Sequence, residues 1–121
     1  MKTHKDLKVW NDSIEFVTLV YQNTKLFPDD EKFALTSQIR RSAVSIPSNI
    51  AEGAARNSDK DFVRYLYIAL GSAAELHTQL IIANNLGYLK TSEFESLSQN
   101  LESISKMTSG LIRSVKNKAN N

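Results

Sequence analysis

The sequence predicts an all-α protein, an up-down-up-down antiparallel four-helix bundle with its second helix kinked. Four segments carry apolar residues at steps of three and four, which is the spacing of one helix face. Four glycines and two prolines among 121 residues leave little material for a turn-rich β fold. Links of about four to six residues join the segments and make consecutive helices antiparallel neighbours. We therefore expect a single domain over residues 1–121.

The first helix is predicted over about residues 6–25, before the helix-disfavouring Phe27-Pro28 pair. One apolar face is formed by Leu7, Trp10, Ile14, Val17 and Tyr21. A second set widens this face beyond what one neighbouring helix covers: Phe16, Leu19 and Val20.

The second helix is predicted over about residues 29–56, with acids in its first turn that complement the helix dipole. Its apolar face consists of Ile39, Ala43, Ile46 and Ile50. Pro47 lies in this stretch, has no N–H for the carbonyl of Ala43 and crowds it, so we expect a kink or a short break. Ser and Asn side chains nearby are expected to satisfy the freed backbone groups.

The third helix is predicted over about residues 58–86, from a Ser58–Asp61 capping box to a left-handed stop at Gly87. One seam is Phe62, Leu66, Ala69, Ala73, Leu76, Leu80 and Ala83. A second seam, one residue further on, is Val63, Tyr67, Leu70, Ala74, His77 and Ile81. Two adjacent seams exceed the needs of a monomeric bundle and indicate a subunit interface.

The fourth helix is predicted over about residues 92–117, beginning at Thr91 or Ser92, with acids in its first half and bases at its end. Its single seam is Phe94, Leu97, Leu101, Ile104, Thr108, Leu111 and Val115.

Composition excludes several classes of site. The chain has no cysteine, so it has no disulfide, thiolate nucleophile or cysteine-based zinc site. Neither His4 nor His77 has a metal-ligand spacing, so we expect no metal or cofactor; His77 is interpreted as a core or interface residue. The polar N-terminus and the lack of a run of about 18 apolar residues predict a cytoplasmic protein without membrane contact. A net charge of +2 favours no particular partner.

Six motifs occur in a fixed order over about residues 6–90. They are Leu7-Lys8-Val9-Trp10, Phe27-Pro28, Gln38-Ile39-Arg40-Arg41, Ser45-Ile46-Pro47-Ser48-Asn49-Ile50-Ala51-Glu52-Gly53, Gly71-Ser72-Ala73-Ala74-Glu75-Leu76 and Leu86-Gly87-Tyr88-Leu89. In these motifs the chain resembles the small bacterial four-helix-bundle proteins of 23S ribosomal RNA intervening sequences. That family is similar to the accessory variability protein of diversity-generating retroelements. The resemblance implies a ring-shaped homopentamer and a nucleic-acid or ribonucleoprotein role.

Five basic residues are candidates for phosphate contact: Arg40, Arg41, Arg56, Lys60 and Arg64. The same side chains also suit a structural role, since Glu52 is near enough in sequence to pair with arginine and Arg56 complements a helix C-terminus. Five further residues are interpreted as structural: Ser45, Pro47, Asn49, Glu52 and Gly53. No pair of carboxylates is forced together by its spacing, so we expect no catalytic residues.

Two functional hypotheses follow. The first is a non-enzymatic, oligomeric accessory protein that binds RNA, DNA or a nucleic-acid enzyme through a ring surface. The second is a protein-interaction scaffold without nucleic-acid contact. The two differ in whether the arginines gather into one unpaired positive surface or are neutralised by acids.

Overall fold

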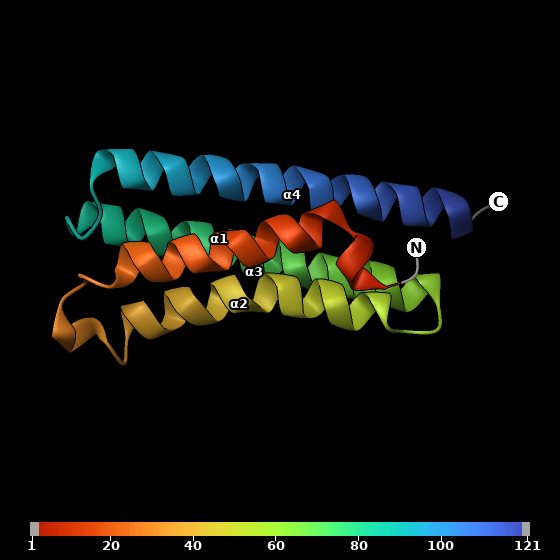
Figure 1. Ribbon diagram of the computed structural model, residues 1–121, viewed down its shortest axis with the longest axis horizontal. Helices are drawn as coiled ribbons and strands as arrows, with labels where there is room; N and C mark the ends of the chain where they lie inside the picture. The colour runs from red at the N-terminus through yellow and green to blue at the C-terminus, as the bar shows by residue number, and fades with distance from the viewer. Residues whose placement is uncertain (1–2, 120–121) are drawn as a thin grey trace.

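The computed structural model describes residues 3–119 and confirms the all-helical bundle (Figure 1). Its elements are η1 (His4–Asp6), α1 (Lys8–Thr24), η2 (Asp29–Glu31), α2 (Leu35–Ala54), α3 (Asp59–Asn85) and α4 (Thr91–Ala119). The expected domain of residues 1–121 extends two residues beyond the described part at each end.

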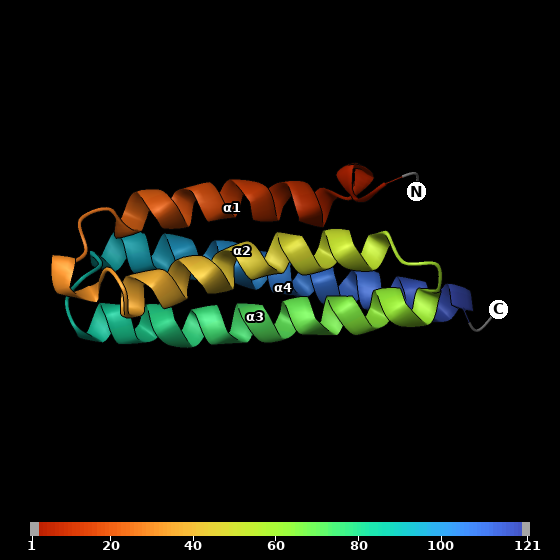
Figure 2. The same ribbon diagram turned by 90° about the horizontal axis from the view of Figure 1, so that it is seen from below.

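Consecutive helices run antiparallel, and the last packs beside the first (Figures 1 and 2). Each helix contacts its two neighbours, and within residues 3–119 the diagonal pairs α1/α3 and α2/α4 make no close approach. The α1–α2 and α3–α4 connections share one end of the bundle, called here the open end. The α2–α3 connection lies at the other end, called here the corner end. Because the helices neighbour one another in the cyclic order α1, α2, α3, α4, the groove between α1 and α2 is opposite the groove between α3 and α4.

The predicted faces of α2 and α3 are buried, with Ile39, Ala43, Ile50, Leu66 and Leu80 fully enclosed. The predicted face of α1 is wrong by one position, because Ile14 and Tyr21 are 41% and 39% exposed. The residues of α1 that enter the core are instead Val9, Ser13, Phe16, Val20 and Thr24.

Two of the α1 core residues are polar, which explains the error. The Ser13 hydroxyl donates to the Trp10 carbonyl at 2.8 Å, and the Thr24 hydroxyl donates to the Val20 carbonyl at 2.9 Å. Both hydroxyls are satisfied by their own helix and cost little to bury. A purely apolar pattern misses such a face.

The second helix begins six residues later than predicted. The acids Asp29–Glu31 form a separate 3-10 turn, and Ala34, with φ −123° and ψ −106°, interrupts the chain before α2 starts at Leu35. The Tyr88 hydroxyl donates to the Glu31 carboxylate at 2.9 Å, which holds η2 against the α3–α4 connection. Phe27 is buried against the Tyr88 ring, whereas Phe33 is 90% exposed. Pinning η2 across the open end thus prevents a continuous helix.

The helix α2 continues through the buried Pro47 without a break, so the interrupted form of the prediction is wrong. The bend itself stays a prediction. The polar partners also differ from those expected: the Asn49 amide donates to the carbonyl of Ser45 at 2.8 Å rather than to that of Ala43.

Apart from the start of α2, the observed helix ends lie close to the predicted ones. The Ser58 hydroxyl accepts from the Asp61 N–H at 3.1 Å, and Gly87 adopts φ +78°, a conformation that glycine enters without steric cost. In the first turn of α4, the Glu93 carboxylate accepts from the Lys90 N–H at 2.9 Å.

The helix α3 corrects the expectation that no segment is apolar enough to cross a membrane. Among the described helices it alone has the length and mean hydropathy, 1.2, for such a span. Its buried residues face α2 and α4, as a central core helix requires. Only 44% of the apolar window is buried, so packing within the chain accounts for part of this hydropathy and leaves an apolar face exposed.

Candidate functional sites

The adjacent arginines of α2 have different environments. The Arg40 Nε donates to the Thr24 hydroxyl at 2.9 Å, and its guanidinium lies 4.5 Å from the centre of the Tyr21 ring. Arg41 is exposed and makes no hydrogen bond or ion pair with any other described residue. Arg40 therefore ties α2 to the end of α1, while Arg41 is free to contact a ligand.

Arg56 belongs to a polar cluster at the corner end. Its guanidinium donates to the Glu52 carboxylate at 3.0 Å and to the Tyr65 hydroxyl at 2.7 Å. The Tyr65 hydroxyl and the Glu52 carboxylate raise the pKa of the Arg56 guanidinium above its ordinary value. Arg64 lies over the same ring, at 5.6 Å. The cluster links α2 to α3 and neutralises one of the candidate phosphate ligands.

The five candidate basic residues do not form one surface within the chain. Arg41 is separated from the end of α2 at Ala54 by roughly 20 Å, at about 1.5 Å per residue. Arg56, Lys60 and Arg64 lie around or beyond that end, and among the described residues Lys60 has no polar partner. The arginines are thus divided between the two ends of the bundle.

Of the five residues interpreted as structural, Ser45, Asn49, Glu52 and Gly53 belong to the contact of α2 with α3, whereas Pro47 faces α1. The Ser45 hydroxyl is 2.8 Å from the Ser72 hydroxyl and accepts from the Asn49 amide at 2.9 Å. Gly53 is buried where the helices come closest: a Cβ on it would lie 2.6 Å from the Cβ of Tyr65. Only glycine permits this approach without a shift of the backbone.

Two apolar surfaces are left uncovered. The α1/α2 groove, defined here by its cavity, is lined by Trp10, Ile14, Val17, Thr18, Val44, Pro47, Ser48 and Ala51. The α3/α4 groove is lined by Leu70, Ala73, Ala74, His77, Ser98, Leu101, Glu102 and Ser105. His77 is exposed in this groove, so it is not a core residue of the single chain. The two grooves face opposite sides of the bundle and have volumes of about 360 and 460 Å³.

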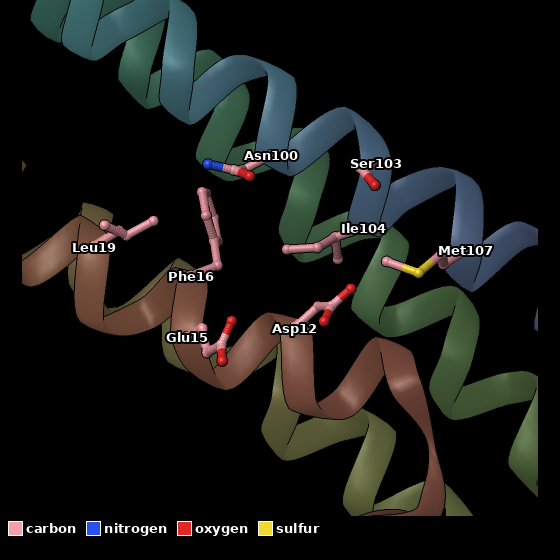
Figure 3. Close-up of a pocket in the computed structure, with 8 residues that line it drawn as sticks. All are labelled: Asp12, Glu15, Phe16, Leu19, Asn100, Ser103, Ile104 and Met107. Atoms are coloured by element: carbon pink, nitrogen blue, oxygen red, sulfur yellow. The ribbon is translucent and has the colours of Figure 1, made fainter.

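A smaller cavity of about 230 Å³ lies between α1 and α4. Figure 3 shows Phe16 reaching from α1 toward Asn100 on α4, with Asp12 and Glu15 beside it. The Asp12 carboxylate pairs with Lys8 at 2.6 Å, so it is already engaged. Within residues 3–119, no group of three potential metal ligands comes together.

A cavity at the open end was not foreseen from the sequence. It has a volume of about 480 Å³ and lies between the end of α1, the turn after η2 and the first half of α2. Arg40 and Arg41 line it together with Tyr21, Lys32 and Phe33. Sequence reasoning missed it because Lys32 and Phe33 fell within the predicted continuous helix over residues 29–56.

Comparison with known proteins identifies the family. The sequence profile described as 23S rRNA-intervening sequence protein matches residues 5–110. The chain belongs to this 23S rRNA-intervening sequence protein family. The predicted resemblance is thereby confirmed.

A crystal structure supports the family assignment. It is that of a protein of unknown function from the S23 ribosomal protein family of Bacteroides thetaiotaomicron, with 30% identity and a TM-score of 0.79. The similarity covers 87% of this chain and 95% of that one. No curated protein matches the chain. Membership in the 23S rRNA-intervening sequence protein family therefore fixes the fold and leaves the biochemical role to be argued from the surfaces.

Proposed function

We propose that this chain is a non-enzymatic, cytoplasmic scaffold protein that assembles with itself into a closed ring, a pentamer. The observation that carries the proposal is the pair of uncovered apolar grooves on opposite sides of the bundle. Exposed apolar surface of this kind commonly marks an interface. Two different faces on one molecule favour a head-to-tail contact, which closes into a ring when the rotation permits.

The composition of the exposed face of α3 supports the same arrangement. Tyr67, Ile68, Ile81 and Ile82 are each between 38% and 50% exposed. Gly71 lies among them, and a Cβ placed there would meet no atom within 4 Å. The glycine is not required by contacts within the chain, so its small size is available to a helix of a neighbouring copy.

The mass in solution tests assembly. Static light scattering at micromolar concentration should return about five times the chain mass of 13.6 kDa. A monomer mass would refute the proposal. A different closed ring would refute only the number of subunits.

Paired variants test the head-to-tail geometry. Ile14→Glu places a charge in the α1/α2 groove, and Ala74→Glu places one in the α3/α4 groove. Each variant alone should be monomeric, because each has lost one side of every contact. An equimolar mixture should form a one-to-one dimer, since each variant retains the face that the other lacks. Gln99→Glu, exposed on α4 outside both grooves, is the matched control and should leave the ring intact.

The mixing result also separates the two classes of symmetry. If each face bound a copy of itself, either single variant would still dimerise through its intact face, and mixing would change nothing. That outcome would contradict a head-to-tail ring. Circular dichroism of each variant should show wild-type helicity, because both substituted residues are exposed.

Nucleic-acid binding is the second candidate, favoured by the position of Arg41. Its guanidinium has no partner among the described residues and lies beside Lys32 and Arg40. A ring would repeat this cationic end once in every subunit, and several phosphate contacts acting together give binding that weakens steeply with salt. RNA or DNA that fails to bind the wild type at about 50 mM salt in fluorescence anisotropy would eliminate this candidate.

A further inference from the structure

The cavity at the open end combines exposed aromatic rings with positive charge. Phe33 is 90% exposed and Tyr21 is 39% exposed, so two aromatic side chains border a space of about 480 Å³. This volume lies in the range of small-molecule sites, about 300–1,000 Å³. The described residues that line it include Lys32, Arg40 and Arg41 and no Asp or Glu.

Each aromatic ring is accompanied by a cation. The Lys32 ammonium lies 5.5 Å from the centre of the Phe33 ring, and the Arg40 guanidinium lies 4.5 Å from that of Tyr21. Because Phe33 is so exposed, a planar group still has access to its ring. The hydrogen bond to Thr24 holds Arg40 over the Tyr21 ring, so this side of the cavity is fixed. Arg41 remains available to contact a ligand.

One buried polar group at the cavity lacks a partner. Thr36 is 6% exposed, and its hydroxyl oxygen makes no hydrogen bond within residues 3–119. A buried hydroxyl without a partner costs free energy, so such groups usually have a use. Thr36 also lines the cavity, although its hydroxyl oxygen is itself enclosed, so this unpartnered group lies behind the cavity surface.

We infer that this cavity binds a nucleotide unit, with the base stacked on Phe33 and the phosphate held by Arg41 and Lys32. A nucleotide has both features that suit this cavity: a flat base for the aromatic ring and a negative phosphate for the cations. The inference rests on the second candidate function above and names its site. It assigns Arg40 a positioning role, because the Arg40 guanidinium packs over the Tyr21 ring that borders the cavity.

The acids of η2 are not part of the cavity lining. The Glu31 carboxylate accepts from Tyr88 at the α3–α4 connection, and neither Asp29 nor Asp30 lines the cavity. Among the described lining residues, the cavity shares Val44 with the α1/α2 groove. Phe33 lies beyond this shared residue, so a neighbour confined to the groove would leave its ring accessible.

The experiment measures the affinity of the full chain for a fluorescein-labelled single-stranded RNA of about 12 nucleotides, a length typical of single-strand sites. Anisotropy titrations are repeated over a series of salt concentrations. A second probe of the same length lacks the bases and keeps the sugar-phosphate backbone. Adenosine monophosphate is added as a competitor to tell a site for free nucleotides from one for a strand.

Phe33→Ala should weaken RNA binding about tenfold or more, the effect of one lost base-aromatic stack, without changing the salt dependence. Arg41→Ala should lower the slope of log K against log salt by about 0.7, the value for one phosphate contact on a single strand. Leu26→Ala removes an equally exposed apolar side chain at the same end and should bind as the wild type does. Lys5→Ala removes an exposed cation of η1, which is neither a candidate for phosphate contact nor part of the cavity lining, and should also bind as the wild type does.

The outcomes separate failure of the site from failure of the second candidate function. No binding of RNA by the wild type overturns both. If the wild type binds RNA and neither Phe33→Ala nor Leu26→Ala changes its affinity, the site is overturned but the second candidate function is not. Binding of the base-free probe as tightly as RNA does the same. If adenosine monophosphate competes with RNA and this competition depends on Phe33, the cavity is a site for free nucleotides. If RNA binding depends on Phe33 but adenosine monophosphate does not compete, the cavity binds a strand.

Discussion

Gly53→Ala tests the packing of α2 on α3 most directly. The new Cβ would lie 2.6 Å from the Cβ of Tyr65 and 3.3 Å from the carbonyl oxygen of Phe62. Carbon atoms in contact prefer about 3.5–4.0 Å, so the helices must separate locally by about 1 Å. Neither opposing atom belongs to the mobile end of a side chain. We therefore expect the upper part of the overpacking range, about 3 kcal/mol.

Alanine also favours the helix over glycine by about 1 kcal/mol, which offsets part of the clash. The net loss in the free energy of unfolding should be about 2 kcal/mol, measured by urea denaturation at fixed protein concentration. Gly110→Ala on α4 is the matched control, because the nearest atom to its added Cβ, in the guanidinium of Arg113 on the same helix, is at 3.8 Å. It should gain up to about 1 kcal/mol. Equal stability of the two variants would refute the close-approach argument.

Three further outcomes are expected. Arg40→Ala should lower the free energy of unfolding by about 1–2 kcal/mol through the lost hydrogen bond and ring contact, whereas Arg41→Ala should change it by less than about 0.5, both measured in urea. The hydrogen bond to Glu31 and partial burial raise the pKa of the Tyr88 hydroxyl above 10.0. The stability that this hydroxyl contributes should therefore be complete below pH 10 and be lost as the pH rises through the folded-state pKa. Tyr88→Phe should abolish this loss, measured by urea denaturation from neutral to alkaline pH. Pro47→Ala should preserve helicity by circular dichroism but change the bend of α2 and the subunit packing, and an unchanged light-scattering mass and crystal structure would contradict this.

The buried faces of α2 and α3 were predictable because apolar residues at the helical spacing form most of each face, although Thr36 and Ser42 of α2 and Ser72 and Gln79 of α3 are buried beside them. The face of α4 was predicted except at its end, where Ile112 enters the core in place of Leu111. Thr108 of α4 is buried too, and its hydroxyl donates to the Ile104 carbonyl at 2.8 Å. On α1 the same device occurs twice, at Ser13 and Thr24, and it was enough to shift the predicted face. Periodicity registers hydrophobicity, and it does not register a hydroxyl that its own helix satisfies.

The candidate site was predictable only in part, since side-chain roles depend on contacts between distant segments. Sequence indicated that Arg40 and Arg41 point about 100° apart but not which of them is engaged. The engaged one is Arg40, whose partner Thr24 lies on another helix. Phe33 was misplaced for a related reason: the contact that interrupts the helix before α2 joins Glu31 to Tyr88, 57 positions away.

The two ends of the bundle thus divide stability from binding. At the corner end, Gly53 permits the closest approach of α2 to α3, and Glu52 and Arg56 hold it with Tyr65. Such a cluster has few free hydrogen-bonding groups left for a ligand. At the open end the helix is interrupted, and an aromatic ring, a cation and a buried hydroxyl all lack full partners. Substitutions at the corner should therefore alter folding first, whereas those of Phe33 and Arg41 at the open end should alter binding while the bundle stays folded.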